Sequence, residues 1–205
     1  MVSNWAVFLA TFISFFLLLQ LLKKKYRLVP VCTIPHRLGP ILLSHHAKVP
    51  CEVALWVAQR GREIWERGLR SEFPEETKED VILTVVHIPY GKMGWADVEE
   101  SRAVINLSCF FLDITHPSFE VQERLLRGVV AEELHHVAYF RRYGDEEYVF
   151  RVEEDSDQRQ LEKILYYALN PQEYAALRFC VQETGDRAEL LQMVEAYRRR
   201  GTEFP

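Results

Sequence analysis

The chain has 205 residues, of which 48% are hydrophobic and 27% charged, and its formal net charge is −5. This composition is typical of a globular protein that is long enough to bury a core without disulfide staples. An acidic balance argues against a general nucleic-acid-binding protein, which would carry an excess or a stripe of basic residues, so no nucleic-acid partner is expected. The four cysteines stand far apart with no C-x-x-C pair, and we interpret them as free thiols rather than a zinc knuckle or a disulfide framework: Cys32, Cys51, Cys109 and Cys180.

An uncharged apolar run from residue 5 to residue 22 is typical of a membrane-spanning helix. At ~1.5 Å per residue it would extend ~27 Å, close to the thickness of the hydrocarbon core of a bilayer. No basic residue precedes the run, whereas Lys23, Lys24 and Lys25 follow it, which favours an uncleaved anchor over a cleaved signal peptide. By the positive-inside rule, the sequence predicts a single-pass membrane protein. Its anchor and basic flank would occupy residues 1–28, and its C-terminal domain would face the cytoplasm.

The next stretch, residues 29–50, contains four prolines and is predicted to be an irregular connecting segment. Residues 51–70 have apolar side chains at helical spacing and are predicted to form a helix. Residues 81–88 are rich in β-branched side chains and end at Pro89, and a second such run covers residues 102–113. Both runs are predicted to be strands.

Four further helices are predicted over residues 117–143, 158–169, 171–183 and 186–200. Pro117 and Gly144 suit the start and the end of the first of these helices, and Pro171 suits the start of the third. The order of one helix, two strands and several helices predicts an α+β domain over residues 51–205.

The most informative motif lies in the middle of the 117–143 helix, in the stretch VVAEELHHVAY. Glu132 and His136 are four residues apart, so both side chains project from one face of the helix and can grip one metal ion. Glu133 is next in sequence to Glu132 and can face the same site. This spacing is that of the H-E-x-x-H helix of zinc proteases, with a glutamate in place of the first histidine.

A second motif, N-P-Q-E-Y-A-A, opens the predicted 171–183 helix and carries Glu173. Together the two motifs resemble the gluzincin class of metallopeptidases, over roughly residues 51–183. The resemblance implies a zincin-like domain made of a backing helix, a small sheet whose edge strand holds peptide, a metal-site helix and a third-ligand helix. It also implies that Glu132, His136 and Glu173 hold zinc, and that Glu133 is the catalytic base. The departure from the family pattern falls on Glu132.

Two functional hypotheses follow from this resemblance. The first is a membrane-anchored, gluzincin-like metallopeptidase that acts on a peptide or protein substrate, with Glu133 deprotonating a water for attack on the peptide carbonyl. The second is a catalytically inactive relative that keeps the fold as a binding or scaffolding module at the membrane. If the metal assignment holds, the donor atoms of Glu132, His136 and Glu173 must converge, Glu133 must face the same cavity, and His135 must point elsewhere.

Alternatives remain open for the same residues. The polar cluster can be free of metal, with an internal Glu132–His136 ion pair. Glu133 and His136 also have the E-x-x-H spacing of di-iron helical bundles, although that architecture needs a second such motif on another long helix. The pair His45–His46 has no carboxylate or cysteine next to it in the sequence, and a surface role is favoured for it.

Overall fold

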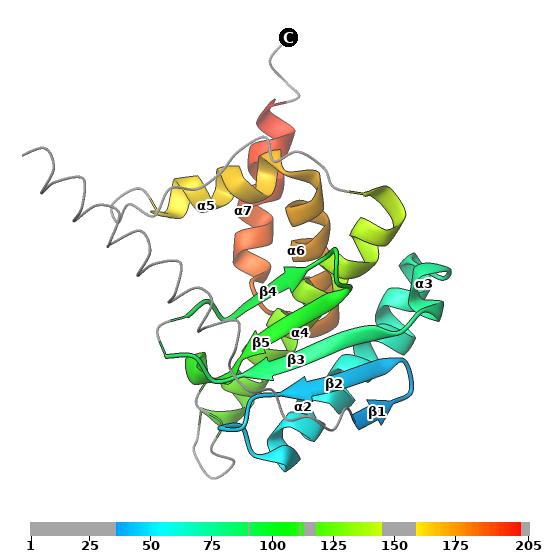
Figure 1. Cartoon of the computed structure of the whole chain (residues 1–205). Helices are drawn as coiled ribbons and strands as arrows, with labels where there is room; N and C mark the ends of the chain where they lie inside the picture. The colour runs from blue at the N-terminus through cyan, green and yellow to red at the C-terminus, as the bar shows by residue number, and fades with distance from the viewer. Residues whose placement is uncertain (1–35, 90, 111, 113–117, 145–158, 202–205) are drawn as a thin grey trace, which may run out of the picture.

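The computed structural model describes residues 36–89, 91–110, 112, 118–144 and 159–201, and these form an α+β domain around a five-stranded sheet (Figure 1). The α+β class therefore agrees with the sequence prediction. The strands are β1 (His36–Leu38), β2 (Ile41–His45), β3 (Val81–Val86), β4 (Gly94–Asp97) and β5 (Arg102–Asn106). Their order across the sheet is β1-β2-β3-β5-β4, so β1 and β4 are its two edges.

The sheet is mixed. Strands β2, β3 and β5 are parallel to one another, whereas β1 and β4 pair antiparallel with their neighbours. Alternate side chains of β2 and β3, such as Ile41, Leu43 and Leu83, are fully buried on the face that packs against helices. The predicted strands 81–88 and 102–113 correspond to β3 and β5, although the second ends early, in a 3₁₀ turn over Leu107–Cys109.

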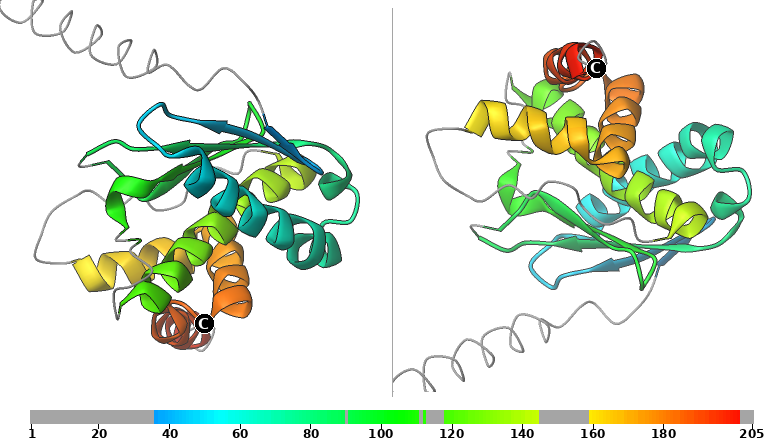
Figure 2. Two further views of the ribbon diagram at one scale, coloured as in Figure 1. Left: turned by 90° about the horizontal axis from the view of Figure 1, so that it is seen from below. Right: turned by 90° about the horizontal axis from the view of Figure 1, so that it is seen from above.

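Two long helices lie against the same face of the sheet (Figure 2). Helix α2 (Cys51–Glu63) contacts β2 and β3, and it continues through a π-helical segment (Ile64–Leu69) into the short α3 (Arg70–Glu72). Helix α4 (Phe119–Tyr143) contacts β4 and β5. Its middle turns are buried, and it ends at Gly144, whose φ of 78° is readily adopted only by glycine.

The C-terminal helices form a further layer on α4, away from the sheet (Figure 2). They are α5 (Arg159–Leu169), α6 (Pro171–Thr184) and α7 (Ala188–Gly201). Helix α6 packs along α4, and α5 and α7 pack on each other and on α6. Their apolar side chains form a small second core, separate from the main core under the sheet: Tyr167, Ala168, Leu177, Leu190 and Val194.

A buried asparagine fixes the loop that leads into β4. The side chain of Asn106, with no exposed surface, accepts a hydrogen bond from Ile88 N at 2.9 Å. Its amide nitrogen donates to Ile88 O at 2.9 Å and to Lys92 O at 3.0 Å. Three hydrogen bonds of one buried side chain hold Ile88 and Lys92 against the end of β5, and so set where the edge strand begins.

The prediction that residues 29–50 are an irregular connection is wrong for their described part. Residues 36–45 form β1 and β2, joined by a tight turn at Gly39 and Pro40, and Pro50 is the N-cap of α2. The prolines therefore mark the ends of short elements, since proline is tolerated at turns and helix starts.

The prediction of a transmembrane helix, and with it a single-pass membrane location facing the cytoplasm, is also wrong. Within the described ranges no helix is both long enough and apolar enough to cross a bilayer. The longest of them, α4, carries charged side chains along its length, from Glu120 to Arg142. The segment on which the anchor was predicted, residues 1–28, lies outside the described residues.

Candidate metal centre

The structure brings Glu132, His136 and Glu173 together. Glu132 and His136 stand one turn apart on α4, and Glu173 lies in the first turn of α6. One donor atom from each side chain lies within 4.8 Å of the others, and all three residues are buried. His136 Nε2 is 3.6 Å from Glu173 Oε2. The predicted convergence of these donor atoms is confirmed, while their binding of a metal stays a prediction.

The local sequence explains the position of Glu173. Asn170 is the N-cap of α6, and Pro171 occupies the first helical position, where its fixed φ suits a helix start. Glu173 therefore falls in the first turn, where the helix dipole favours a carboxylate. Because α6 packs along α4, that first turn faces His136.

Glu132 is held by two residues that no sequence motif singled out, Tyr167 and Arg187. Tyr167 Oη donates to Glu132 Oε1 at 2.9 Å, and Arg187 Nη1 donates to Glu132 Oε2 at 2.5 Å. Arg187 Nη1 also lies 3.3 Å from Tyr167 Oη. The ion pair of Glu132 is thus with Arg187, instead of the Glu132–His136 pair considered above.

The pKa values of Arg187 and Tyr167 both depend on the nearby Glu132 carboxylate. Burial by itself would lower the pKa of Arg187, but the Glu132 carboxylate outweighs it, and the pKa of Arg187 is raised. Burial, with Glu132 next in importance, raises the pKa of Tyr167 well above its usual value. Tyr167 therefore stays a neutral hydrogen-bond donor to Glu132, and Arg187 stays a cation.

Glu133 faces the same cavity as the three donors and is 8% exposed. Burial raises the pKa of Glu133 well above its usual value, and the nearby carboxylates of Glu132 and Glu173 raise it further. Three carboxylates thus share one buried pocket with Arg187, an arrangement that a bound cation would stabilise.

The edge strand β4 runs directly against Glu133. A Cβ added at Gly94 would lie 2.7 Å from Val129 Cγ1 and 2.9 Å from both Cγ and Oε1 of Glu133. Only a glycine at this position lets the strand approach α4 so closely.

The Gln172 side chain supports His136. Its amide nitrogen lies 3.1 Å from His136 Nδ1. In this orientation the amide N–H donates to Nδ1. Turned by half a rotation, the amide oxygen would instead accept from Nδ1–H and leave the lone pair on Nε2, the nitrogen nearer to Glu173.

His135 points away from the cluster, as predicted. It is fully buried, with its ring 5.2 Å from that of Phe73 and 5.4 Å from that of Phe179. Its Nε2 lies 3.8 Å from Glu72 Oε1. Burial lowers the pKa of His135, which makes it a neutral member of the core.

A cavity of about 500 Å³ opens over the cluster. Helix α4, the C-terminal helices and the stretch around β4 all contribute to its wall, and Met93 and Trp95 on the strand side are 39% and 36% exposed. Strand β4 pairs only with β5 in the described sheet, so its other edge is available beside the cavity. The lining residues on that side are Lys92, Met93, Gly94, Trp95, Ala96 and Val98.

No protein-family model, no curated protein and no solved structure matches this chain.

Proposed function

We propose that this domain is a gluzincin-like zinc metallopeptidase that hydrolyses peptide bonds. The observation that carries the proposal is the convergence of Glu132, His136 and Glu173 within 4.8 Å, in a cavity that Glu133 also lines. Two carboxylates and an imidazole form a donor set that binds zinc. When bound, the zinc ion supplies Lewis acidity toward the substrate carbonyl.

Substrate binding in this proposal uses the open edge of β4. An extended peptide that adds to this edge lies across the cavity mouth, with backbone hydrogen bonds for affinity and side-chain contacts for selectivity. The half-exposed side chains of Met93 and Trp95 offer apolar contacts for such a peptide. This geometry fits a peptide better than a compact small molecule.

Glu133 is the residue that moves the proton. Its carboxylate accepts a proton from a water molecule while the water oxygen bonds to the peptide carbonyl carbon. The same proton then passes to the amide nitrogen as the carbon–nitrogen bond breaks, so that one carboxylate serves both steps. Burial, together with the carboxylates of Glu132 and Glu173, raises the pKa of Glu133, and a positive ion among the carboxylates would oppose this rise.

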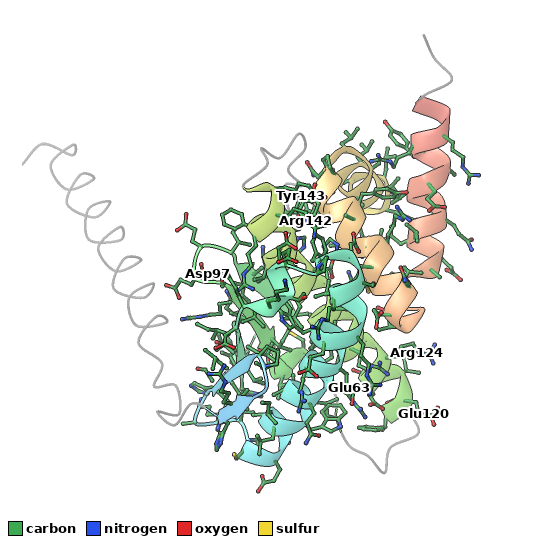
Figure 3. All side chains as sticks on the ribbon, turned by 90° about the vertical axis from the view of Figure 1, so that its right-hand side faces the viewer. Glu63, Asp97, Glu120, Arg124, Arg142 and Tyr143 are labelled. Atoms are coloured by element: carbon green, nitrogen blue, oxygen red, sulfur yellow. The ribbon has the colours of Figure 1, made fainter. Side chains whose placement is uncertain are left out.

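The test separates metal binding from catalysis. Glu173→Gln should weaken zinc binding at this cluster by at least ~10-fold in calorimetry, whereas Glu183→Gln, on the same helix but outside the cluster, should not. Glu133→Gln should lower the hydrolysis of a peptide library by ~10²–10⁴-fold while zinc binding persists. Its matched control is Glu120→Gln, at the exposed N-terminal end of the same helix (Figure 3).

The second candidate is a catalytically inactive binding module of the same fold. The observation in its favour is that both oxygens of Glu132 already accept hydrogen bonds, from Tyr167 and Arg187, so this carboxylate has protein partners without a metal. If zinc binding to the full chain does not depend on Glu173, and Glu133→Gln changes no hydrolysis, this second function replaces the first.

A further inference from the structure

We infer that the chain has a second zinc site, formed by His36, His45 and Cys51 at the opposite edge of the sheet from the Glu132 cluster. One donor atom from each of these residues lies within 4.8 Å of the others. Strand β1 is one edge of the sheet and β4 is the other, so the two clusters are separated by the full width of the sheet (Figure 1). The site is therefore independent of the proposed peptidase function.

The strand register explains how the two histidines meet. His36 lies opposite Leu43 in the antiparallel pairing of β1 with β2. Leu43 and His45 are two residues apart on one strand, so they share a face. His36 and His45 are thus diagonal neighbours on the face that packs against α2.

The third donor comes from the start of α2. After β2 the chain turns through residues 46–50, and Cys51 is the first residue of the helix. Its Sγ lies 3.7 Å from His36 Nε2. In a tetrahedral zinc site with Zn–S of ~2.3 Å and Zn–N of ~2.0 Å, sulfur and nitrogen ligands are ~3.5 Å apart. The observed separation is close to this value, and a thiolate is well placed at the positive end of the helix dipole.

His45 provides the second, independent observation. Its side chain is buried, with 5% exposure, and its Nδ1 lies 3.2 Å from His46 O. Its Nε2 is buried and has no hydrogen-bond partner among the described residues. A proton held on Nδ1 by the carbonyl leaves the Nε2 lone pair free, which is the arrangement found in histidines that bind metals.

The chemistry of the three donor atoms indicates which metal ion this site would bind. Two imidazoles and a thiolate are softer ligands than the two carboxylates and one imidazole of the Glu132 cluster, and they suit Zn²⁺ over Mg²⁺ or Ca²⁺. Three protein ligands leave the fourth tetrahedral position to water. A zinc ion here ties the three-residue strand β1 to both β2 and α2, and so secures an edge of the sheet.

Cobalt substitution tests this site because, of the two clusters in the described part of the chain, this one alone contains sulfur. The reduced, chelator-treated full chain is titrated with Co²⁺, which takes the place of zinc. The expected result is a near-ultraviolet thiolate-to-cobalt charge-transfer band that grows with added Co²⁺ and then saturates. The band should vanish in Cys51→Ser and persist in Cys109→Ser, a half-buried cysteine outside the cluster. It should also persist in Glu173→Gln, which separates this site from the peptidase site.

Two results would overturn the inference. One is a wild-type protein that shows no thiolate band at saturating Co²⁺, and the other is a band that survives in Cys51→Ser. X-ray absorption of the zinc-loaded wild-type chain is a second measurement that needs no variant. It should show a sulfur at ~2.3 Å with imidazole nitrogens at ~2.0 Å, and a spectrum without the sulfur shell contradicts the site.

Discussion

Arg187 Nη1 lies 2.5 Å from Glu132 Oε2, so the carboxylate that stands where zinc-protease helices have a histidine is held by an arginine from the α6–α7 connection. The Glu132 carboxylate places a negative charge in a buried site. Arg187 compensates that charge from within the protein. Glu132 and Arg187 therefore form a buried pair of opposite charges.

Loss of Arg187 should destabilise the domain. In Arg187→Met the Glu132 carboxylate stays buried beside two other carboxylates without its cation, and we expect a loss of about 3 kcal/mol in the free energy of unfolding. Saturating Zn²⁺ should restore part of this loss, because the metal replaces the missing positive charge. Urea denaturation with and without zinc measures both effects. Arg124→Met, on the exposed face of α4 (Figure 3), is the control and should change stability little.

A histidine at position 132 should not stabilise the protein on its own. Glu132→His leaves Arg187 buried with no carboxylate partner at this position, so we expect lower stability than wild type. The double variant Glu132→His/Arg187→Met should recover stability, with a coupling energy of about 2 kcal/mol in a double-mutant cycle. Additive effects of the two substitutions would show that the two residues are not linked in this way.

The close approach of β4 to α4 should depend on the absence of a side chain at Gly94. Gly94→Val would push atoms against Val129 and Glu133, and we expect a loss of about 1–3 kcal/mol, together with a shift of the edge strand. Met93→Val, at the neighbouring half-exposed position, should cost far less. Thermal unfolding gives the stabilities. Equal losses for both variants would argue against tight packing at Gly94.

Acid sensitivity should arise in part from the pair Glu76–Arg142. Arg142 donates to both carboxylate oxygens of Glu76, at 2.9 and 2.7 Å, and lowers the pKa of Glu76 through this hydrogen bonding (Figure 3 labels Arg142). A carboxyl with a lowered folded-state pKa stabilises the fold above its unfolded pKa, and this stabilisation is lost as pH falls through the folded pKa.

The measurement is the free energy of unfolding from neutral pH down to about pH 3. Glu76→Gln should show a shallower decline on acidification than wild type, because its amide does not titrate. Glu75→Gln is the matched control, since Glu75 is exposed and pairs with Lys78 on the surface. Parallel curves for wild type and Glu76→Gln would contradict the prediction.

The helices could be predicted closely from the sequence, because each has apolar residues at helical spacing and clear ends. Pro171 and Gly144, for example, mark the start of α6 and the end of α4. Three of the five described strands could not be predicted from the sequence. Strands β1 and β2 are short and lie among prolines, and β4 has only four residues and begins with a glycine, so none shows the long β-branched run that identified β3.

The candidate site, too, could be predicted only in part from the sequence. Glu132, Glu133 and His136 could be selected because helical spacing fixes which side chains share a face, and Glu173 because it follows a proline at a helix start. Arg187 and Tyr167 reach Glu132 through the packing of α5 to α7 on α4, which no local pattern records. His36, His45 and Cys51 meet only because β1 and β2 form a hairpin over the start of α2, and these strands were not predicted.

The small second core of the C-terminal helices has a consequence for how the molecule opens. Glu132 and His136 belong to the helix that closes the main core, whereas Glu173, Tyr167 and Arg187 belong to the unit built around the second core. A local opening that lifts α5–α7 from α4 would separate Glu173 from Glu132 and His136 while the sheet stays folded. A metal bound by both Glu173 and His136 would link the C-terminal helices to α4, and it would close a loop of chain that contains all of α5. Its presence should slow amide exchange in α5–α7 more than in β3.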